Sequence, residues 1–240
     1  MKKIDLLAFA AHPDDVELAA AGTLLKHKAL GYTIGIIDLT QGELGSRGSA
    51  AIRKEEAAAS AKILNLDVRE NLMLKDGFFE NDETTKKIII QAIRKYQPTI
   101  VLANAISDRH PDHGRAAKLV SEACFLSGLI KVETEFEGLQ QEAHRPKKLY
   151  HYIQDNYLEP DFIMDISSVY EQKKRAIQAF SSQFHTNKQT EGVKTPISGQ
   201  DFQEFLDGRA RQFGRIGKCD FAEGFTCDGG FGASNLFELH

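Results

Sequence analysis

Short apolar stretches alternate with amphipathic ones along the first half of the chain. Residues 4–11 form a nearly continuous apolar run, which is typical of a parallel strand covered on both faces. Residues 14–30 carry apolar side chains at helical spacing and are followed by Gly31, a residue type favoured just past a helix end. The pattern therefore predicts a strand followed by a helix.

The same alternation continues to about residue 126. It predicts further strands over residues 33–39, 68–72 and 99–103 and further helices over residues 49–66, 82–96 and 111–126. A glycine-rich loop covers residues 42–48, and Ser49 is suited to cap the helix that follows it. Alternation of strands and helices with short connections predicts an α/β fold, a Rossmann-like, doubly wound and mostly parallel sheet with helices on both faces.

The pattern is less regular in the second half of the chain. It indicates strands over residues 149–153 and 162–166, helices over residues 168–180 and 199–213, and a polar loop over residues 184–197. We find no internal repeat, low-complexity tract or linker. The 240 residues, 42% of them hydrophobic, are enough for one sizeable core, so residues 1–240 are expected to form a single domain.

Composition excludes several classes of partner. The net charge of −4 and the pI of about 6.1 give no basic field that would attract nucleic acid. No apolar run approaches the roughly 20 residues that a membrane helix needs. Three scattered cysteines are typical of a reducing compartment, and the N-terminal residues run into a strand without a cleavage site, so we expect a cytoplasmic protein.

Two histidine-containing segments stand at the ends of predicted strands. Residues 11–15 read Ala-His-Pro-Asp-Asp, and residues 108–113 read Asp-Arg-His-Pro-Asp-His. Pro13 and Pro111 mark helix starts, because proline is tolerated in the first turn of a helix. Open α/β sheets bind ligands outside the carboxyl ends of their strands, so both segments fall where a ligand is expected.

The residue types in these segments fit a catalytic metal centre. His12 and Asp15 lie three positions apart on a helical turn and can converge on one ion, while His113 can approach from the other segment. Two imidazoles and one carboxylate, with a position left for water, form an open zinc site. Asp14 is then a spare carboxylate suited to accept a proton, and His110 a spare imidazole suited to stabilise or protonate a tetrahedral intermediate.

The segments also allow other interpretations. Either segment alone also fits a loop before a helix that an aspartate caps, but two of them at equivalent places favour a metal site. Two histidines and a carboxylate also form the facial triad of non-haem iron(II) oxygenases, although the pair of Asp14 and Asp15 favours hydrolysis. A nucleotide-binding module would need a Gly-x-Gly-x-x-Gly turn after the first strand, which is absent.

These motifs resemble the PIG-L/LmbE superfamily of zinc-dependent deacetylases. Further segments resemble its bacillithiol-biosynthesis branch: residues 39–45, Arg53 with residues 56–57, residues 108–110, 182–184 and 222–225. The resemblance covers most of the chain. It implies an LmbE-like fold, Zn²⁺ with Fe²⁺ as an alternative, and a homo-oligomer such as a hexamer. The implied substrate is the N-acetylglucosamine conjugate N-acetylglucosaminyl-malate, and the alternative is another N-acyl sugar or conjugate.

The resemblance also implies roles for single residues. The metal ligands fall on His12, Asp15 and His113, the general base on Asp14, the histidine beside the oxyanion on His110, and an orienting carboxylate on Asp112. Residues 18–22 contain fewer glycines than is usual in the family, which concerns helix packing and leaves the ligands in place.

Two arginines are candidates for holding a carboxylated substrate, because a guanidinium matches a carboxylate with two hydrogen bonds. Arg109 precedes His110, and Arg53 lies in a first helical turn, where a cation opposes the helix dipole and has no simple stabilising role. Ser46, in the glycine-rich loop, is a weaker candidate for the same pocket. His185 is a candidate for the cleft or a subunit interface.

Overall fold

A seven-stranded sheet forms the centre of the computed structural model, which describes residues 2–184, 193–199 and 201–229. His185 and much of the predicted polar loop over residues 184–197 lie outside the described residues. The strand order is β3-β2-β1-β4-β7-β9-β8. The strands are β1 (Leu6–Ala10), β2 (Ile34–Thr40), β3 (Val68–Leu74), β4 (Ile100–Ala103), β7 (Lys148–Tyr152), β8 (Phe162–Asp165) and β9 (Ala222–Thr226).

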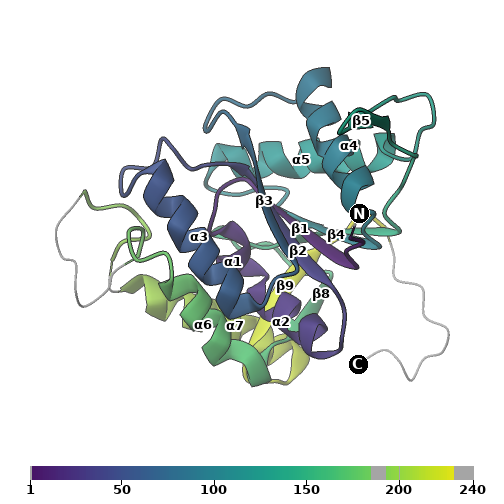
Figure 1. Cartoon of the computed structure of the whole chain (residues 1–240). Helices are drawn as coiled ribbons and strands as arrows, with labels where there is room; N and C mark the ends of the chain where they lie inside the picture. The colour runs from purple at the N-terminus through teal and green to yellow at the C-terminus, as the bar shows by residue number, and fades with distance from the viewer. Residues whose placement is uncertain (1, 185–192, 200, 230–240) are drawn as a thin grey trace, which may run out of the picture.

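The neighbouring strands from β3 to β7 pair in parallel, whereas β9 runs antiparallel to both β7 and β8. Helices cover both faces of this sheet (Figure 1). They are α1 (Asp15–Ala19), α2 (Ala21–Ala29), α3 (Ala50–Leu64), α4 (Glu83–Tyr96), α5 (Pro111–Leu126), α6 (Tyr170–Gln178) and α7 (Asp201–Gly217), with a 3₁₀ turn at Ser167–Val169. The predicted doubly wound, mostly parallel architecture is confirmed.

Strand β1 explains why a nearly continuous apolar run predicts a strand in the middle of the sheet. All five of its residues are buried, because helices lie on both faces. Leu7 and Phe9 point into the core formed with α4 and α5, while Leu6, Ala8 and Ala10 point into the core formed with α1 and α2. In Figure 1, α4 and α5 lie on one side of the sheet and the remaining helices on the other.

Local capping confirms two predicted helix starts. The side chain of Ser49 accepts a hydrogen bond from the backbone N–H of Ile52 at the start of α3. Asp82 does the same for Thr85 at the start of α4, at 2.8 Å. Each cap satisfies a backbone donor that the first helical turn leaves without a partner.

The single helix predicted over residues 14–30 is wrong, because the chain breaks at Ala20 into α1 and α2. The backbone of Ala20 departs from the helical conformation, with φ of −140° and ψ of 3°. The new helix start gains a buried partner: the N–H groups of Gly22 and Thr23 each donate to the carboxylate of Glu223 at 2.8 Å. This anion stabilises the N-terminus of α2, and it comes from a strand at the far end of the chain.

Strand β9 was not predicted, and neither was the small hairpin of β5 (Glu135–Phe136) and β6 (Leu139–Gln140). Strand β9 contains Gly224, a residue type that is depleted in strands. Its place requires glycine, because a Cβ atom there would lie 2.8 Å from the ring of Phe213 in α7. Within the described ranges, no helix is both long and apolar enough to cross a membrane.

Candidate active site

The two histidine-containing segments meet at the carboxyl ends of β1 and β4. His12 and Asp14 lie between β1 and α1, and Asp15 is the first residue of α1. His110 is the N-cap of α5, and His113 lies in the first turn of the same helix. All five side chains line one cavity of about 350 Å³. The structure therefore brings together the residues that the sequence pattern selected.

Two histidines from different segments face the carboxylate of Asp15. Nε2 of His113 lies 3.1 Å from Oδ1 of Asp15, and Nδ1 of His12 lies 3.7 Å from Oδ2. The ring centroids of His12 and His113 are 5.6 Å apart. One nitrogen of each ring and the carboxylate thus converge on a small common volume.

The second nitrogen of each ring is held by a carboxylate outside that volume. Nε2 of His12 lies 3.1 Å from Oδ1 of Asp76 and 3.3 Å from Oδ2 of Asp112. Nδ1 of His113 lies 2.5 Å from Oδ2 of Asp108. A carboxylate on the outer nitrogen fixes ring orientation and tautomer, and it leaves the inner nitrogen available as a ligand. Asp112 lies beside the outer nitrogen of His12, and the orienting role that the family resemblance implied for it stays a prediction.

The carboxylates around His12 and His113 favour the protonated forms of both rings. Burial acts to lower the pKa of His12, but hydrogen bonds to Asp112, Asp15 and Asp76 raise it well above its ordinary value. Burial also acts to lower the pKa of His113, but Asp15 and Asp108 raise it to about 9. A divalent cation needs neutral imidazoles, so its binding would release these protons and take over their role.

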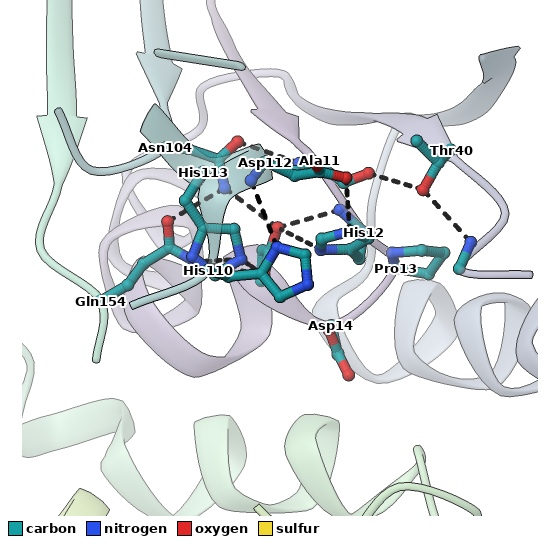
Figure 2. A network of polar contacts seen from close by, with 12 residues as sticks. Ala11, His12, Pro13, Asp14, Thr40, Asn104, His110, Asp112, His113 and Gln154 are labelled. Atoms are coloured by element: carbon teal, nitrogen blue, oxygen red, sulfur yellow. Dashed lines mark hydrogen bonds and ion pairs between the residues drawn. The ribbon is translucent and has the colours of Figure 1, made fainter. Parts of the chain in front are cut away.

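Asp14 is turned away from the three histidine rings (Figure 2). Its Oδ2 lies 3.0 Å from Nη2 of Arg53, which also donates a hydrogen bond to the carbonyl oxygen of Pro13. Burial raises the pKa of Asp14 to about 7, although the charge of Arg53 acts to lower it. The backbone φ of 125° is unusual for a non-glycine residue, and such strain is concentrated at functional sites.

His110 has a different setting from the other two histidines. Its Nδ1 accepts a hydrogen bond from the backbone N–H of Asp112 at 3.3 Å, so in the neutral ring the proton sits on Nε2. Burial lowers the pKa of His110, and the charges of His12 and His113 add to this effect. Nitrogen atoms of the three histidines lie within 4.8 Å of one another, so the ring is close to the converging ligand atoms. A neutral imidazole here can donate a hydrogen bond from Nε2.

The predicted substrate residues Arg53, Arg109 and Ser46 all line the cavity. The guanidinium of Arg53 is buried against Asp14, and its Nε has no hydrogen-bond partner among the described residues. Arg109 is exposed and forms an ion pair with Asp155, while Ser46 is exposed on its loop. Contact of these residues with substrate remains a prediction.

Sequence reasoning missed four side chains that build the site. Asp76 and Asp108 hold the outer nitrogens of the histidines, and Asn104 and Gln154 donate hydrogen bonds to Asp15. Asn104 follows β4 directly and Asp108 lies in the loop between β4 and α5, so position after a strand end was an available signal. Asp76 and Gln154 belong to no short motif.

Comparison with known proteins identifies the family. The family model described as PIG-L: GlcNAc-PI de-N-acetylase matches residues 7–124. Diacetylchitobiose deacetylase of Thermococcus kodakarensis is 31% identical over 196 residues, which cover 77% of this chain and 71% of that protein. The chain belongs to the PIG-L family.

Other relatives extend the picture. A conserved protein from Thermus thermophilus has the same fold, with a TM-score of 0.85 and 34% identity over 97% of this chain and 98% of that one. The 4-oxalmesaconate hydratase of Pseudomonas putida is 29% identical over 194 residues, 75% of this chain and 74% of that protein. A probable N-acetyl-alpha-D-glucosaminyl L-malate deacetylase 2 from Bacillus anthracis is 27% identical over 128 residues, only 47% of this chain and 55% of that protein. The superfamily resemblance is confirmed, whereas similarity to the malate branch is weaker than similarity to the chitobiose deacetylase.

Proposed function

We propose that this protein is a metal-dependent hydrolase that removes the acetyl group from an N-acetylglucosamine conjugate. One observation carries the proposal: His12 and His113 direct their inner nitrogens at Asp15 while carboxylates hold their outer nitrogens. Packing alone would not require a carboxylate on the outer nitrogen of each ring, whereas histidines that bind a metal typically have one. Membership of a family described by a de-N-acetylase supports the same activity.

The donor set fits a divalent transition metal. We assign His12 Nδ1, Asp15 and His113 Nε2 as its ligands, and two imidazoles with one carboxylate suit Zn²⁺ or Fe²⁺. When bound, zinc would supply Lewis acidity that polarises the amide carbonyl and makes a water molecule more acidic.

The remaining residues account for proton transfer in the proposed reaction. Asp14, held by Arg53, accepts the proton from the attacking water as the new carbon–oxygen bond forms. His110 donates a hydrogen bond from Nε2 to the tetrahedral intermediate. Asp14 then delivers the proton that it accepted to the leaving nitrogen as the carbon–nitrogen bond breaks, which gives acetate and a free amino sugar.

The finer assignment of the substrate is a malate conjugate. The sequence resemblance and the presence of Arg109 and Arg53 in the cavity support it. The alternative is a different N-acyl sugar or conjugate, which similarity to the chitobiose deacetylase supports. The homo-oligomeric state, with a hexamer as a specific form, and the cytoplasmic location stay predictions.

Release of a primary amine is the decisive assay. The zinc-loaded protein should be tested against N-acetylglucosaminides that carry malate, inositol or a neutral methyl group. Amine and acetate in equal amounts, also under anaerobic conditions, would support hydrolysis and oppose an iron(II) oxygenase. If none of these compounds released amine and the protein hydrated 4-oxalmesaconate, the activity named for the Pseudomonas relative would replace the proposal.

Replacing His110 by alanine should separate this residue from the ligands. We expect stoichiometric metal and an unchanged KM, with turnover about 10²–10³-fold lower because one donor to the intermediate is lost. Metal analysis and steady-state kinetics measure the two effects. Loss of metal in His110→Ala would instead favour a ligand set of three histidines, whose nitrogens are close enough in this structure.

Replacing Arg109 by alanine tests the malate assignment. A bidentate pair with a carboxylate contributes about 1.5–3 kcal/mol, so KM for the malate conjugate should rise about ten- to a hundredfold. KM for the methyl glycoside should barely change. Arg53→Ala should weaken use of the malate conjugate as well, with an added loss of turnover on both substrates because Arg53 holds Asp14. Equal KM changes on both substrates would show that Arg109 does not bind the aglycone.

A further inference from the structure

Two buried amide side chains donate hydrogen bonds to the carboxylate of Asp15. Asn104 follows β4 and is completely buried, and Gln154 follows β7 and is 4% exposed. Neither belongs to the ligand, base or substrate residues assigned above. Their position beside the proposed ligand indicates that they act on Asp15.

The hydrogen bonds leave no freedom in how either amide is oriented. Oδ1 of Asn104 accepts from the backbone N–H of Ala11 at 2.9 Å, so its Nδ2 must face Asp15 and Gln154. Oε1 of Gln154 accepts from Asn104 Nδ2 at 3.0 Å and from the N–H of Ala105 at 3.1 Å. Nε2 of Gln154 is therefore the atom that faces Asp15.

The two amides donate to different oxygens of Asp15. Oδ2 accepts two hydrogen bonds, from the backbone N–H of His12 and from Nδ2 of Asn104, both at 2.9 Å. Oδ1 accepts one amide hydrogen bond, from Nε2 of Gln154 at 3.1 Å. Oδ1 also faces His113, whose Nε2 lies 3.1 Å from Oδ1 and 3.4 Å from the same nitrogen of Gln154. A carboxylate oxygen has about two lone-pair sites, so Oδ2 is filled and Oδ1 keeps one site.

Contacts to the backbone carbonyl oxygens of Asn104 and Gln154 hold both residues in place. Nδ1 of His151 contacts the carbonyl oxygen of Asn104 at 2.8 Å. The guanidinium of Arg209, from α7, donates to the carbonyl oxygen of Gln154 and, at 2.9 Å, to that of Leu18. The pair is thus fixed by elements that do not themselves contact Asp15.

We propose that Asn104 and Gln154 are positioning residues that present Oδ1 of Asp15 as a single-oxygen metal ligand and raise the affinity of the site. The inference rests on the proposed function, because it takes Asp15 as a ligand. Asn104, together with the backbone N–H of His12, blocks Oδ2, and Gln154 orients Oδ1 toward His113. Residues that orient ligands in this way typically change metal affinity about 10- to 100-fold.

The experiment measures zinc affinity directly, by competition with a chromophoric chelator. Gln154→Met keeps nearly the same side-chain volume but removes the donor to Oδ1, and we expect zinc affinity to fall about 10- to 100-fold. Asn104→Ala provides a second, independent test with the same expected direction. Thermal unfolding of the metal-free variants shows whether each is folded. The zinc affinity of either folded variant then tests the proposal.

Gln183→Met is the matched control. Gln183 is also a buried glutamine that lines the cavity, but its amide donates to the carbonyl oxygen of Arg47 and to the hydroxyl of Ser182. It should bind zinc like the wild type. Wild-type affinity in folded Gln154→Met, or an equal loss in Gln183→Met, would overturn the proposal.

Cobalt substitution gives a second readout that a merely structural role would not change. Asn104→Ala removes one of the two donors to Oδ2 and opens one lone-pair site on it. Asp15 should then bind through both oxygens, and the cobalt visible bands should weaken as the coordination number rises. Unchanged bands would contradict blocking of Oδ2 by Asn104. Neither measurement needs substrate, so a wild type that binds zinc tightly but releases no amine would defeat the proposed function while leaving this inference to be judged on its own.

Discussion

Replacement of His113 or His12 by alanine is expected to abolish measurable deacetylation and to lower bound zinc well below one ion per chain. Each variant leaves only two of the three proposed ligands, and an open site rarely holds its ion on two. It also leaves carboxylates without their imidazole partners, Asp108 in one case and Asp76 in the other. Elemental analysis after dialysis against a weak chelator measures the metal, and amine release measures the activity.

A histidine outside the site supplies the control. Nε2 of His144 contacts the carbonyl oxygen of Pro98, and its ring does not line the cavity. His144→Ala should keep full metal content and activity. Full metal content in His113→Ala would mean that the ligand assignment is wrong, and retention of metal only in His12→Ala would point to a site built around α5.

The parts of the fold that could be predicted are those that depend on neighbouring residues. The apolar run of β1, the caps of Ser49 and Asp82 and the proline that starts α5 act within a few positions of the chain. The His-Pro-Asp segments belong to this group, because each combines a strand end with a helix start. Their meeting in space followed from the parallel order of β1 and β4.

The parts that escaped prediction depend on residues far apart in the sequence. The break between α1 and α2 is stabilised by Glu223, which lies 201 positions from Gly22. Strand β9 inserts antiparallel between β7 and β8, and no local pattern specifies such a partner. The support of the site has the same character, since Asp76 lies 64 positions from His12 and Gln154 lies 139 positions from Asp15.

Arg53 illustrates a difference between proximity and role. Its place after the glycine-rich loop suggested a side chain directed at substrate, yet the structure puts its guanidinium on Asp14 and on the carbonyl oxygen of Pro13. A Cβ atom at Gly42 would lie 3.0 Å from its Cζ, so the loop packs directly on the guanidinium. Arg53 can therefore serve the proposed base even where it also contacts substrate.

The second large effect is expected from Asp14. If Asp14 accepts the proton from the attacking water, Asp14→Asn should retain zinc and lose about 10²–10⁴ in turnover, because an amide cannot take the proton. This loss corresponds to about 3–5 kcal/mol in the activation barrier. Asparagine suits the position for two reasons: it tolerates the positive φ of 125°, and its oxygen can still accept a hydrogen bond from Arg53.

Asp14→Gly completes the test, because glycine accepts the same backbone conformation without strain and leaves a space where the carboxylate was. Added formate should restore part of the turnover of Asp14→Gly but none of that of Asp14→Asn, whose side chain still fills the space. Zinc content and thermal unfolding should match the wild type in both variants. Near-normal turnover in Asp14→Asn would remove Asp14 from the mechanism, and loss of zinc in either variant would place Asp14 among the ligands instead.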